Sequence, residues 1–344
     1  MPPSSTLPSS IANEEILDDI MTSPSSALVR DLADVEGDIL VLGVGGKMGP
    51  TLAQLARRAA PQKRILAVSR FTDRGLRESL DNSGIETVAA DLLDRSAVDR
   101  LPRARNVVFM AGYKFGANDN PGLTWAMNVL VPAFVADSFR DSRVVAFSTG
   151  CVYAFAPVQK GGSRESEHPD PPGEYAMSCL GRERMFEYYS RLHSTTGRLF
   201  RLNYSIDLRY GVLHDIAVKV RNGEPLDVTM GHVNFIWQGD ACAQALRCLK
   251  HCTTPTTPIN VSGPEILSVR ALAEELGARL GKRPVIVGKE ADRSWLTNTA
   301  LAVQLFGAPQ ISVSVLLDWV ADWVAADRRS LNKPTKFDVR TGAY

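Results

Sequence analysis

The sequence has few of the features that mark secreted, membrane-spanning or nucleic-acid-binding proteins. Its five cysteines form no C-x-x-C pair and no zinc-binding pattern, which indicates reduced thiols in a cytoplasmic protein. No apolar run reaches membrane-spanning length, and the N-terminus lacks both the basic region and the apolar core of a signal peptide. Lys and Arg total 39 against 38 Asp and Glu, so no net charge recruits nucleic acid or an acidic membrane surface. We therefore expect neither as a partner.

Two kinds of catalytic centre are also missing from the sequence. There is no G-x-S-x-G motif for a serine nucleophile, and the five histidines lack the spacing of metal ligands, so we predict no metal site. Cys151 and Cys179 have no histidine nearby in the sequence, which favours inert thiols over nucleophiles. The 344 residues, 44% hydrophobic and 22% charged, have an ordinary globular composition that can bury a substantial core.

Residues 38–58, DILVLGVGGKMGPTLAQLARR, are the most informative stretch of the chain. The apolar run Ile39–Leu42 predicts a short buried strand, which is followed by a glycine-rich turn and an amphipathic helix. In a dinucleotide site, Gly43 would permit the tight turn, Gly46 would let the backbone approach a pyrophosphate, and Gly49 would bring the helix close to the sheet. Pro50 suits a first helical turn. Ordinary turns also select glycine, but this position between strand and helix favours dinucleotide binding.

Alternating strand and helix patterns predict an α/β fold, a doubly wound parallel sheet of the Rossmann type with right-handed crossovers. Further strands are expected at residues 65–68, 86–91, 106–111, 144–148, 197–203 and 259–262, and helices at residues 11–21, 27–32, 123–139 and 269–280. Ser268 is a candidate N-cap for the last helix.

The same patterns divide the chain into four parts. Residues 1–36 form an N-terminal extension whose Pro/Ser-rich start, residues 1–10, is expected to be disordered. Residues 37–202 and 237–262 form a dinucleotide-binding domain. Residues 203–236 and 263–330 form a smaller C-terminal substrate lobe, and residues 331–344 form a tail.

Several motifs together resemble those of the extended short-chain dehydrogenase/reductases, also called NAD-dependent epimerase/dehydratases. They are GVGGKMG at 43–49, DLLD at 91–94, Asn128 within MNVLVPA, STGCVY at 148–153, EYAMSCLGRERMFE at 174–187, WQGDACAQAL at 237–246 and NVSGPEILSVRALAEEL at 260–276. Their order and spacing extend the resemblance over residues 38–325. It implies hydride transfer between a nicotinamide cofactor and a carbinol carbon of a sugar or sugar-derived substrate, as net oxidation or reduction, or as epimerisation through a transient ketone.

The resemblance also implies a catalytic set, with one departure. In that family a Ser or Thr and a Tyr bind the reacting oxygen, and a Lys four residues after the Tyr lowers its pKa and holds the nicotinamide ribose. The motifs place Thr149 and Tyr175 at the first two positions and Cys179 at the position of the Lys. Residues i and i+4 share a helical face, so this geometry needs a cation at 179. A thiol with a usual pKa of about 8.5 supplies no positive charge, and a Tyr with a pKa of about 10 is a poor base at pH 7.

Three interpretations of the missing lysine are open. In the first, Lys114 in the loop AGYKFG supplies a substitute cation, because the loop after that strand should border the nicotinamide. In the second, Tyr175 acts only as a hydrogen-bond donor. In the third, the chain is a catalytically inactive dinucleotide-binding sensor or partner protein. Cys179 favours this last interpretation, whereas Thr149, Tyr175 and Asn128 favour an enzyme.

The end of the second strand bears on the choice of cofactor. An acidic residue there would accept hydrogen bonds from the ribose 2′-OH of NAD, whereas Ser69 and Arg70 suit a 2′-phosphate and favour NADP over NAD. The alternative for Arg70 is a solvated surface side chain. The other cofactor-binding positions that the resemblance implies are Gly45, Lys47, Met48, Asp91, Leu92, Ala111, Asn128, Cys179 and Asn203, with Asn128 ordering a proton-relay water.

Substrate contacts are expected from the C-terminal lobe. The candidates are Tyr204 and Arg209, which follow the strand ending at Asn203, together with His232 and Trp237. Arg209 or His232 would meet a carboxylate or phosphate of the substrate, unless it makes a structural ion pair. Because dimers that form through a four-helix contact are common in the family, we also expect a homodimer.

Overall fold

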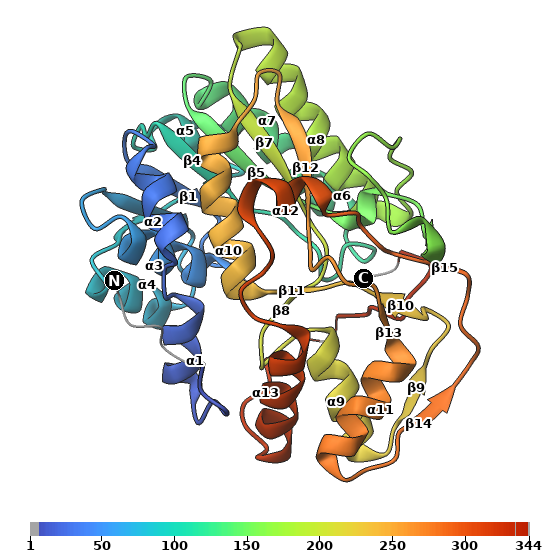
Figure 1. The fold of residues 1–344 in the computed structure, drawn as a ribbon. Helices are drawn as coiled ribbons and strands as arrows, with labels where there is room; N and C mark the ends of the chain where they lie inside the picture. Colours follow the sequence, from blue (N-terminus) through green and yellow to red (C-terminus); the bar gives the residue numbers. More distant parts are fainter. Residues whose placement is uncertain (1–6, 334, 343–344) are drawn as a thin grey trace.

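The computed structural model describes residues 7–333 and 335–342. In this part of the chain, seven parallel strands form one sheet in the order β12-β7-β5-β4-β1-β2-β3 (Figure 1). The strands are β1 (Ile39–Leu42), β2 (Ile65–Ser69), β3 (Glu86–Ala89), β4 (Asn106–Phe109), β5 (Arg143–Thr149), β7 (Gly197–Leu202) and β12 (Thr257–Val261). The strand order reverses between β1 and β4, which is the arrangement of a doubly wound nucleotide-binding sheet. The predicted fold class is confirmed.

Helices cover both faces of the sheet because the strands are apolar on both sides. Ile39 and Val41 of β1 belong to one buried core, and Leu40 and Leu42 belong to the core on the opposite face. Strands buried on both faces are typical of parallel sheets. The first face is covered by α2 (Ser26–Ala33), α3 (Gly49–Ala59), α4 (Arg74–Asn82) and α10 (Gln238–Arg247), and the second by α5 (Arg95–Asp99), α7 (Val131–Ser138) and α8 (Gly173–His193).

A smaller lobe lies beyond the carboxyl ends of the strands (Figure 1). Its own core contains Trp237, Trp319 and Trp323, and the N-terminal helix α1 (Glu14–Met21) adds Leu17 and Met21 to it. The lobe contains α9 (Val212–Asn222), α11 (Val269–Leu280), α13 (Val313–Ala325) and the strand pairs β9 (Pro225–Asp227) with β14 (Val285–Val287) and β10 (His232–Val233) with β13 (Leu267–Ser268). The elements that join it to the sheet are β8 (Ser205–Ile206) paired with β11 (Ile236–Trp237), β6 (Ala156–Pro157) paired with β15 (Arg293–Ser294), and α12 (Ala300–Phe306).

After α13, the chain returns along the lobe toward the start of α8. The N–H of Leu331 donates to the carbonyl of Arg209 (3.0 Å), and the N–H of Thr335 donates to the carboxylate of Asp215 (2.8 Å). Near its end, Gly342 packs against the backbone of Gly173, the first residue of α8. We call residues 331–333 and 335–342 the tail. Because of these contacts, the tail spans from the lobe to the helix that carries Tyr175.

The ends of several elements differ from the sequence-based expectations. Helix α11 with Ser268 as its N-cap is confirmed, because the Ser268 hydroxyl accepts a hydrogen bond from the N–H of Ala271 (3.2 Å). Helix α1 begins only at Glu14, because Asn13 caps it (2.9 Å to the N–H of Ile16). Strands β3, β4 and β7 end one or two residues earlier than predicted, since ladder pairing stops there. Of the Pro/Ser-rich start, residues 1–6 lie outside the described residues.

The helix expected over residues 123–139 is divided into three parts. It runs as α6 (Pro121–Trp125), a π-helical turn (Ala126–Leu130) and α7. Pro132 has no N–H to donate to the carbonyl of Asn128, which would be its α-helical acceptor, so the regular ladder cannot continue through this point. The wider turn places the Asn128 side chain in the protein interior.

A buried ion pair fastens α8 to the sheet. Glu183 of α8 and Arg201 of β7 lie 2.6 Å apart with exposed side-chain fractions of 0% and 3%. The carboxylate of Glu183 also accepts a hydrogen bond from Ser148 of β5, and the guanidinium of Arg201 donates to the hydroxyl of Tyr153. The network therefore sets the position of the helix that carries Tyr175.

Candidate active site

A cleft of about 400 Å³ opens at the carboxyl ends of β1, β4, β5 and β7. This is the edge of the sheet, beside the reversal of strand order, where open α/β folds bind ligands. The cleft is lined by residues 43 and 45–49 after β1, 110 and 112–115 after β4, 147–149 and 151 of β5 and the turn that follows, Tyr175 and Arg182 of α8, residues 202–205, 210 and 212, and Lys333 and Thr335 of the tail. It brings together Thr149, Tyr175, Lys114 and most of the glycine turn.

The glycine turn has the geometry of an anion-binding loop. Gly43 has φ of +90°, which an L-residue adopts only with strain, and a Cβ at Gly49 would lie 2.2 Å from the carbonyl oxygen of Val44. In the described part of the chain, the backbone N–H groups of Gly45, Lys47 and Met48 have no hydrogen-bond partner. Unpaired N–H groups at the start of a helix are the donors that a phosphate accepts from. The turn therefore fits the pyrophosphate of a dinucleotide.

Lys47 reaches from this turn across the cleft. Its Nζ lies 3.8 Å from the ring centroid of Tyr210 and 3.4 Å from the carbonyl oxygen of Ser205. Burial lowers the pKa of Lys47 to about 8, although the charge of Asp207 opposes the shift. The ammonium is therefore a cation at neutral pH that loses its charge in mildly basic solution.

Tyr175 and Thr149 both line the cleft and carry hydroxyl groups. Burial raises the pKa of Tyr175 well above its usual value, and the hydrogen bond that its hydroxyl makes with the Cys179 sulfur shifts it in the same direction. The hydroxyl oxygen of Thr149 accepts a hydrogen bond from the N–H of Cys151 (3.1 Å), so its own proton is available to another acceptor. Burial also raises the pKa of Cys179, which keeps it a neutral thiol. At neutral pH the site therefore holds a protonated Tyr175.

Lys114, in the loop after β4, lies close to the ring of Tyr175. Its Nζ is 5.6 Å from the Tyr175 ring centroid and 5.7 Å from that of Phe115. Burial lowers the pKa of Lys114, while the charges of Cys151 and Cys179 would raise it. The position next to the ring is the one that the substitute-cation interpretation requires.

Asn128 is enclosed in the wall of the cleft. Its side-chain oxygen accepts from the N–H of Tyr113 (2.9 Å) and from Nη2 of Arg182 (2.7 Å). Its side-chain nitrogen donates to the carbonyl of Tyr113 (2.9 Å) and to Oγ of Ser178 (2.9 Å). Both N–H groups of the amide are thus engaged within the protein, which leaves neither of them to order the expected relay water.

Sequence reasoning missed Arg182, although the signal was present in the helix. Positions 175, 179 and 182 follow the i, i+4, i+7 spacing that places side chains on one helical face. Arg182 is 6% exposed and donates from Nη1 to the carbonyl of Phe147 (2.8 Å).

The residues expected at the adenosine end lie beside the cleft, at the ends of β2 and β3. A Cβ at Gly45 would lie 2.6 Å from Oγ of Ser69, so these two residues are in contact across the turn. The side chains of Arg70 and Asp91 are exposed. Leu92 and Ala111 belong to the core on the α7 side of the sheet.

Only part of the expected substrate wall reaches the cleft. Asn203 and Tyr204 line it, and the amide of Asn203 also donates to Oδ1 of Asn234 (2.9 Å). Trp237 is buried in the lobe against Trp319, with ring centroids 5.8 Å apart. His232 is part of β10, where it pairs with Ser268 of β13. Trp237 and His232 do not line the cleft, because packing and strand pairing hold them in the lobe.

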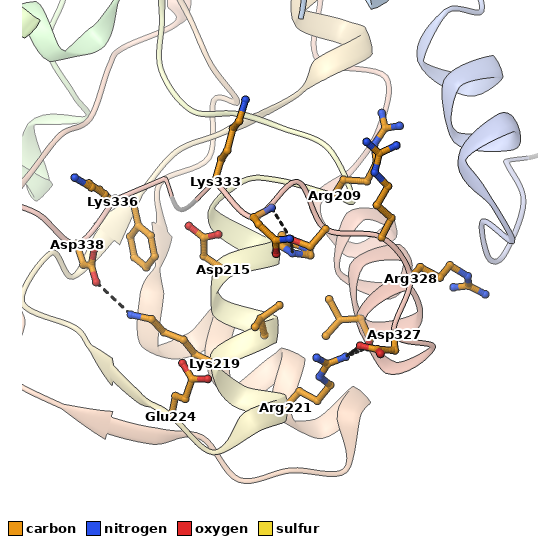
Figure 2. A pocket seen from close by; sticks show the side chains of 17 residues that line it. Arg209, Asp215, Lys219, Arg221, Glu224, Asp327, Arg328, Lys333, Lys336 and Asp338 are labelled. Carbon is orange, nitrogen blue, oxygen red and sulfur yellow. Dashed lines mark hydrogen bonds and ion pairs between the residues drawn. The ribbon is translucent and has the colours of Figure 1, made fainter. Parts of the chain in front are cut away.

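Arg209 makes structural ion pairs, which were the alternative to a contact with the substrate. Its guanidinium contacts the carboxylates of Glu14 (2.8 Å), Asp18 (2.9 Å) and Asp207 (3.1 Å). It lines a second, larger cavity of about 790 Å³ between α9 and the tail. Figure 2 shows this cavity with the ion pairs Lys219–Asp338 and Arg221–Asp327 across it. The lining cations Arg209, Lys219, Arg221, Arg328 and Arg329 are ion-paired, and Arg209 lies outside the cleft lining.

In residues 7–333 and 335–342, no group of three or more His, Cys, Asp or Glu side chains is arranged to hold a metal ion. Across the same residues, none of the helices combines the length and the apolar character needed to cross a bilayer.

The comparisons with known proteins agree with this geometry. The sequence matches the profile of the NAD dependent epimerase/dehydratase family over residues 39–251. No curated protein matches the sequence. A solved UDP-galactose 4-epimerase is similar in structure, with a TM-score of 0.67 and 22% identity over 84% of this chain and 99% of that one. For the dTDP-glucose 4,6-dehydratase of Streptomyces venezuelae, the TM-score is 0.72 and the identity 19%, over 84% of this chain and 97% of that one. For the UDP-glucose 4-epimerase of Thermus thermophilus in complex with NAD, the TM-score is 0.68 and the identity 18%, over 83% of this chain and 98% of that one.

Proposed function

Because this chain belongs to the NAD dependent epimerase/dehydratase family, we propose that it is an NAD(P)-dependent oxidoreductase or epimerase that transfers a hydride at a carbinol carbon of a sugar-derived substrate. The observation that carries the proposal is the meeting, in one cleft, of the unpaired N–H groups of the glycine turn with the hydroxyls of Thr149 and Tyr175. The similar structures are named for UDP-galactose, UDP-glucose and dTDP-glucose, which supports a nucleotide sugar as the substrate.

The chain's own residues have distinct roles in this proposal. When bound, the nicotinamide supplies or accepts the hydride. The N–H groups of Gly45, Lys47 and Met48 hold the pyrophosphate. The hydroxyls of Thr149 and Tyr175 bind and orient the reacting oxygen, and Tyr175 donates its proton to that oxygen as negative charge develops there. Lys114, next to the Tyr175 ring, adds a positive charge that favours the phenolate left behind.

The experiment that tests cofactor binding begins with protein purified without added nucleotide. Nucleotide released on denaturation is identified, and the emptied protein is titrated with NADPH and NADH. A stoichiometric retained nucleotide supports a redox-neutral epimerase or dehydratase, and a reversibly filled site supports a net oxidoreductase. Failure of the wild type to bind either nucleotide refutes the proposal.

The preference for NADP rests on Arg70. Its exposed guanidinium, next to Ser69 at the end of β2, is free to meet a 2′-phosphate. Arg70→Ala should remove the preference for NADPH over NADH, and Arg74→Ala, which changes an exposed arginine at the start of α4, should leave it unchanged. Equal effects of the two substitutions would show that the loop contributes only general positive charge.

A catalytically inactive dinucleotide-binding sensor is the second candidate. The observation that favours it is the neutral Cys179 thiol beside a Tyr175 whose pKa is raised by burial. To separate the two functions, the protein with bound NADP or NADPH is mixed with a panel of nucleotide sugars, and the nicotinamide absorbance and the sugar products are followed. Turnover that Tyr175→Phe and Thr149→Val abolish supports the enzyme. Binding with no turnover across the panel supports the sensor.

We also propose a homodimer formed through α8 and the π-helical turn. Tyr188 and Leu192 of α8 have exposed fractions of 57% and 56%, and Leu130 of the π-helical turn has 46%. Large exposed apolar side chains on neighbouring helices favour an interface between copies. Light scattering should report a dimer that Leu192→Glu dissociates, and a monomeric wild type would refute this part.

A further inference from the structure

Arg182 is a buried cation with no carboxylate next to it. Its side chain is 6% exposed, and its hydrogen bonds go only to neutral oxygens, the carbonyl of Phe147 and the amide of Asn128. In the described part of the chain, no acidic group lies within ion-pair distance of it, and its Nε has no hydrogen-bond partner. Glu183, the next residue, points instead to Arg201. A charge buried in this way is costly unless a partner arrives to compensate it.

The guanidinium lies where a ligand of the cleft would supply that compensation. Arg182 lines the cleft together with Gly112 of the loop after β4. A Cβ at Gly112 would be 2.4 Å from Nη2 of Arg182, so only glycine leaves room for the guanidinium in this wall. Asn128 and the ring of Phe109, whose centroid is 5.5 Å from Cζ, hold the group in place. The loop after β4 therefore leaves space for the guanidinium of Arg182 because position 112 is glycine.

The position along α8 relates Arg182 to Tyr175 and Cys179. The three residues share one helical face, with Arg182 one turn beyond the position where the family has its lysine. The positive charge of Arg182 acts on both neighbours, and it opposes the rise that burial produces in the pKa of Cys179 and of Tyr175. Arg182 is therefore close enough to both side chains to affect their ionisation.

Resting on the function proposed above, we propose that Arg182 is the positioning residue that replaces the missing lysine. Its guanidinium supplies a positive charge near Tyr175 and favours binding of the nicotinamide half of the dinucleotide. Lys114 belongs to the loop after β4 and Arg182 to α8, so the two cations can be substituted separately. A guanidinium keeps its charge at every pH at which the protein is folded, which suits a fixed electrostatic role.

The test compares five proteins: wild type, Arg182→Met, Cys179→Lys, the double variant with both changes, and Arg184→Met. Arg184 is the matched control, since it is a half-exposed arginine of the same helix whose partner is Glu187. Each protein is titrated with NADPH and NADH, and with their adenosine halves, 2′,5′-ADP and ADP. Thermal unfolding of each protein is measured without nucleotide.

The proposal predicts that Arg182→Met weakens binding of the whole dinucleotide by about tenfold or more. Binding of the adenosine half should not change, and the melting temperature should stay the same or rise, because no acidic partner is left unpaired. The lysine of the double variant should restore binding. Arg184→Met should have no effect on any of the titrations.

Other outcomes overturn the proposal. If Arg182 has only a structural role, Arg182→Met should have a lower melting temperature and should lose equal affinity for the dinucleotide and for its adenosine half. The double variant should then recover no binding. Wild-type affinity in Arg182→Met refutes the role while the proposed function stands. If the wild type itself binds no nucleotide, the proposed function fails, and this inference fails with it. If Arg182→Met does not fold but the double variant folds and binds, the replacement of one cation by the other is supported directly.

Discussion

The buried ion pair between Glu183 and Arg201 makes a quantitative prediction about how α8 is held. The two side chains have exposed fractions of 0% and 3%, and two N–H···O contacts of 2.8 and 2.6 Å join them. Burial opposes the charge of Arg201, but its hydrogen bonds and ion pair with Glu183 raise the pKa above the usual value. The guanidinium of Arg201 therefore remains charged in the folded protein.

Glu183→Gln removes one charge and keeps the shape of the side chain. The guanidinium of Arg201 would then be buried with only the neutral oxygens of the new amide and of Tyr153 as acceptors. Removing one partner of a buried ion pair costs about 3–5 kcal/mol, so we expect a loss of that size in the free energy of unfolding. Replacing both residues, Glu183→Leu with Arg201→Met, should cost much less than the single change, because no buried charge remains unpaired.

Urea unfolding followed by circular dichroism measures these differences. The control is Arg184→Gln, which removes an i,i+3 pair with Glu187 whose side chains are 48% and 19% exposed. Such a pair contributes about 0–1 kcal/mol. If Glu183→Gln costs no more than Arg184→Gln, or if the double replacement costs more than the single one, the reasoning about burial and charge is refuted.

Three further predictions follow from the site and from a second buried carboxylate. Because the pKa of Lys47 is lowered to about 8 by burial, its charge is lost as the pH rises through that value, so the affinity for NADPH should fall between about pH 7 and 9, and Lys47→Met should flatten this dependence in fluorescence titrations. Burial raises the pKa of Asp240 to about 6, so its neutral form stabilises the fold below about pH 4, and this contribution is lost as the pH rises through 6. In urea unfolding, the free energy of unfolding of Asp240→Asn should therefore gain up to about 3 kcal/mol relative to that of the wild type between pH 4 and 7. Parallel pH profiles of the two proteins would contradict this. A Cβ at Gly49 would lie 2.2 Å from a backbone oxygen, whereas a Cβ at Gly46 would lie 3.6 Å from one. Gly49→Ala should therefore lower the free energy of unfolding by about 1–3 kcal/mol, while Gly46→Ala should keep the melting temperature and lose nucleotide affinity. The reverse pattern would refute the assignment of the turn.

The sequence alone determined the features that depend on neighbouring residues. The apolar run Ile39–Leu42, the glycine turn after it and the serine cap of α11 are local signals, and each appears in the structure where it was predicted. Alternating strands and helices were sufficient to predict the doubly wound sheet, because a right-handed crossover leaves few ways to connect parallel strands. The π-helical turn differs from the continuous helix that was predicted, because Pro132 has no N–H to donate to the carbonyl of Asn128.

Tertiary structure decided which polar side chains meet. Arg209 is surrounded by Glu14 and Asp18, residues almost two hundred positions away, so no local pattern could distinguish its ion pairs from a substrate contact. Likewise, the tail delivers Lys333 and Thr335 to the cleft only because it folds back over the lobe. These contacts depend on the path of the whole chain through space.

Local sequence patterns were also insufficient to identify the positive charge near Tyr175. From the sequence, the thiol at position 179 indicated a missing cation, and Lys114 was the replacement that the strand order suggested. Only the packing of α8 against β5 and the loop after β4 shows that Arg182 is buried, lines the cleft and has no acidic partner among the described residues. Helical spacing is encoded locally, whereas burial and the pairing of charges are properties of the folded chain.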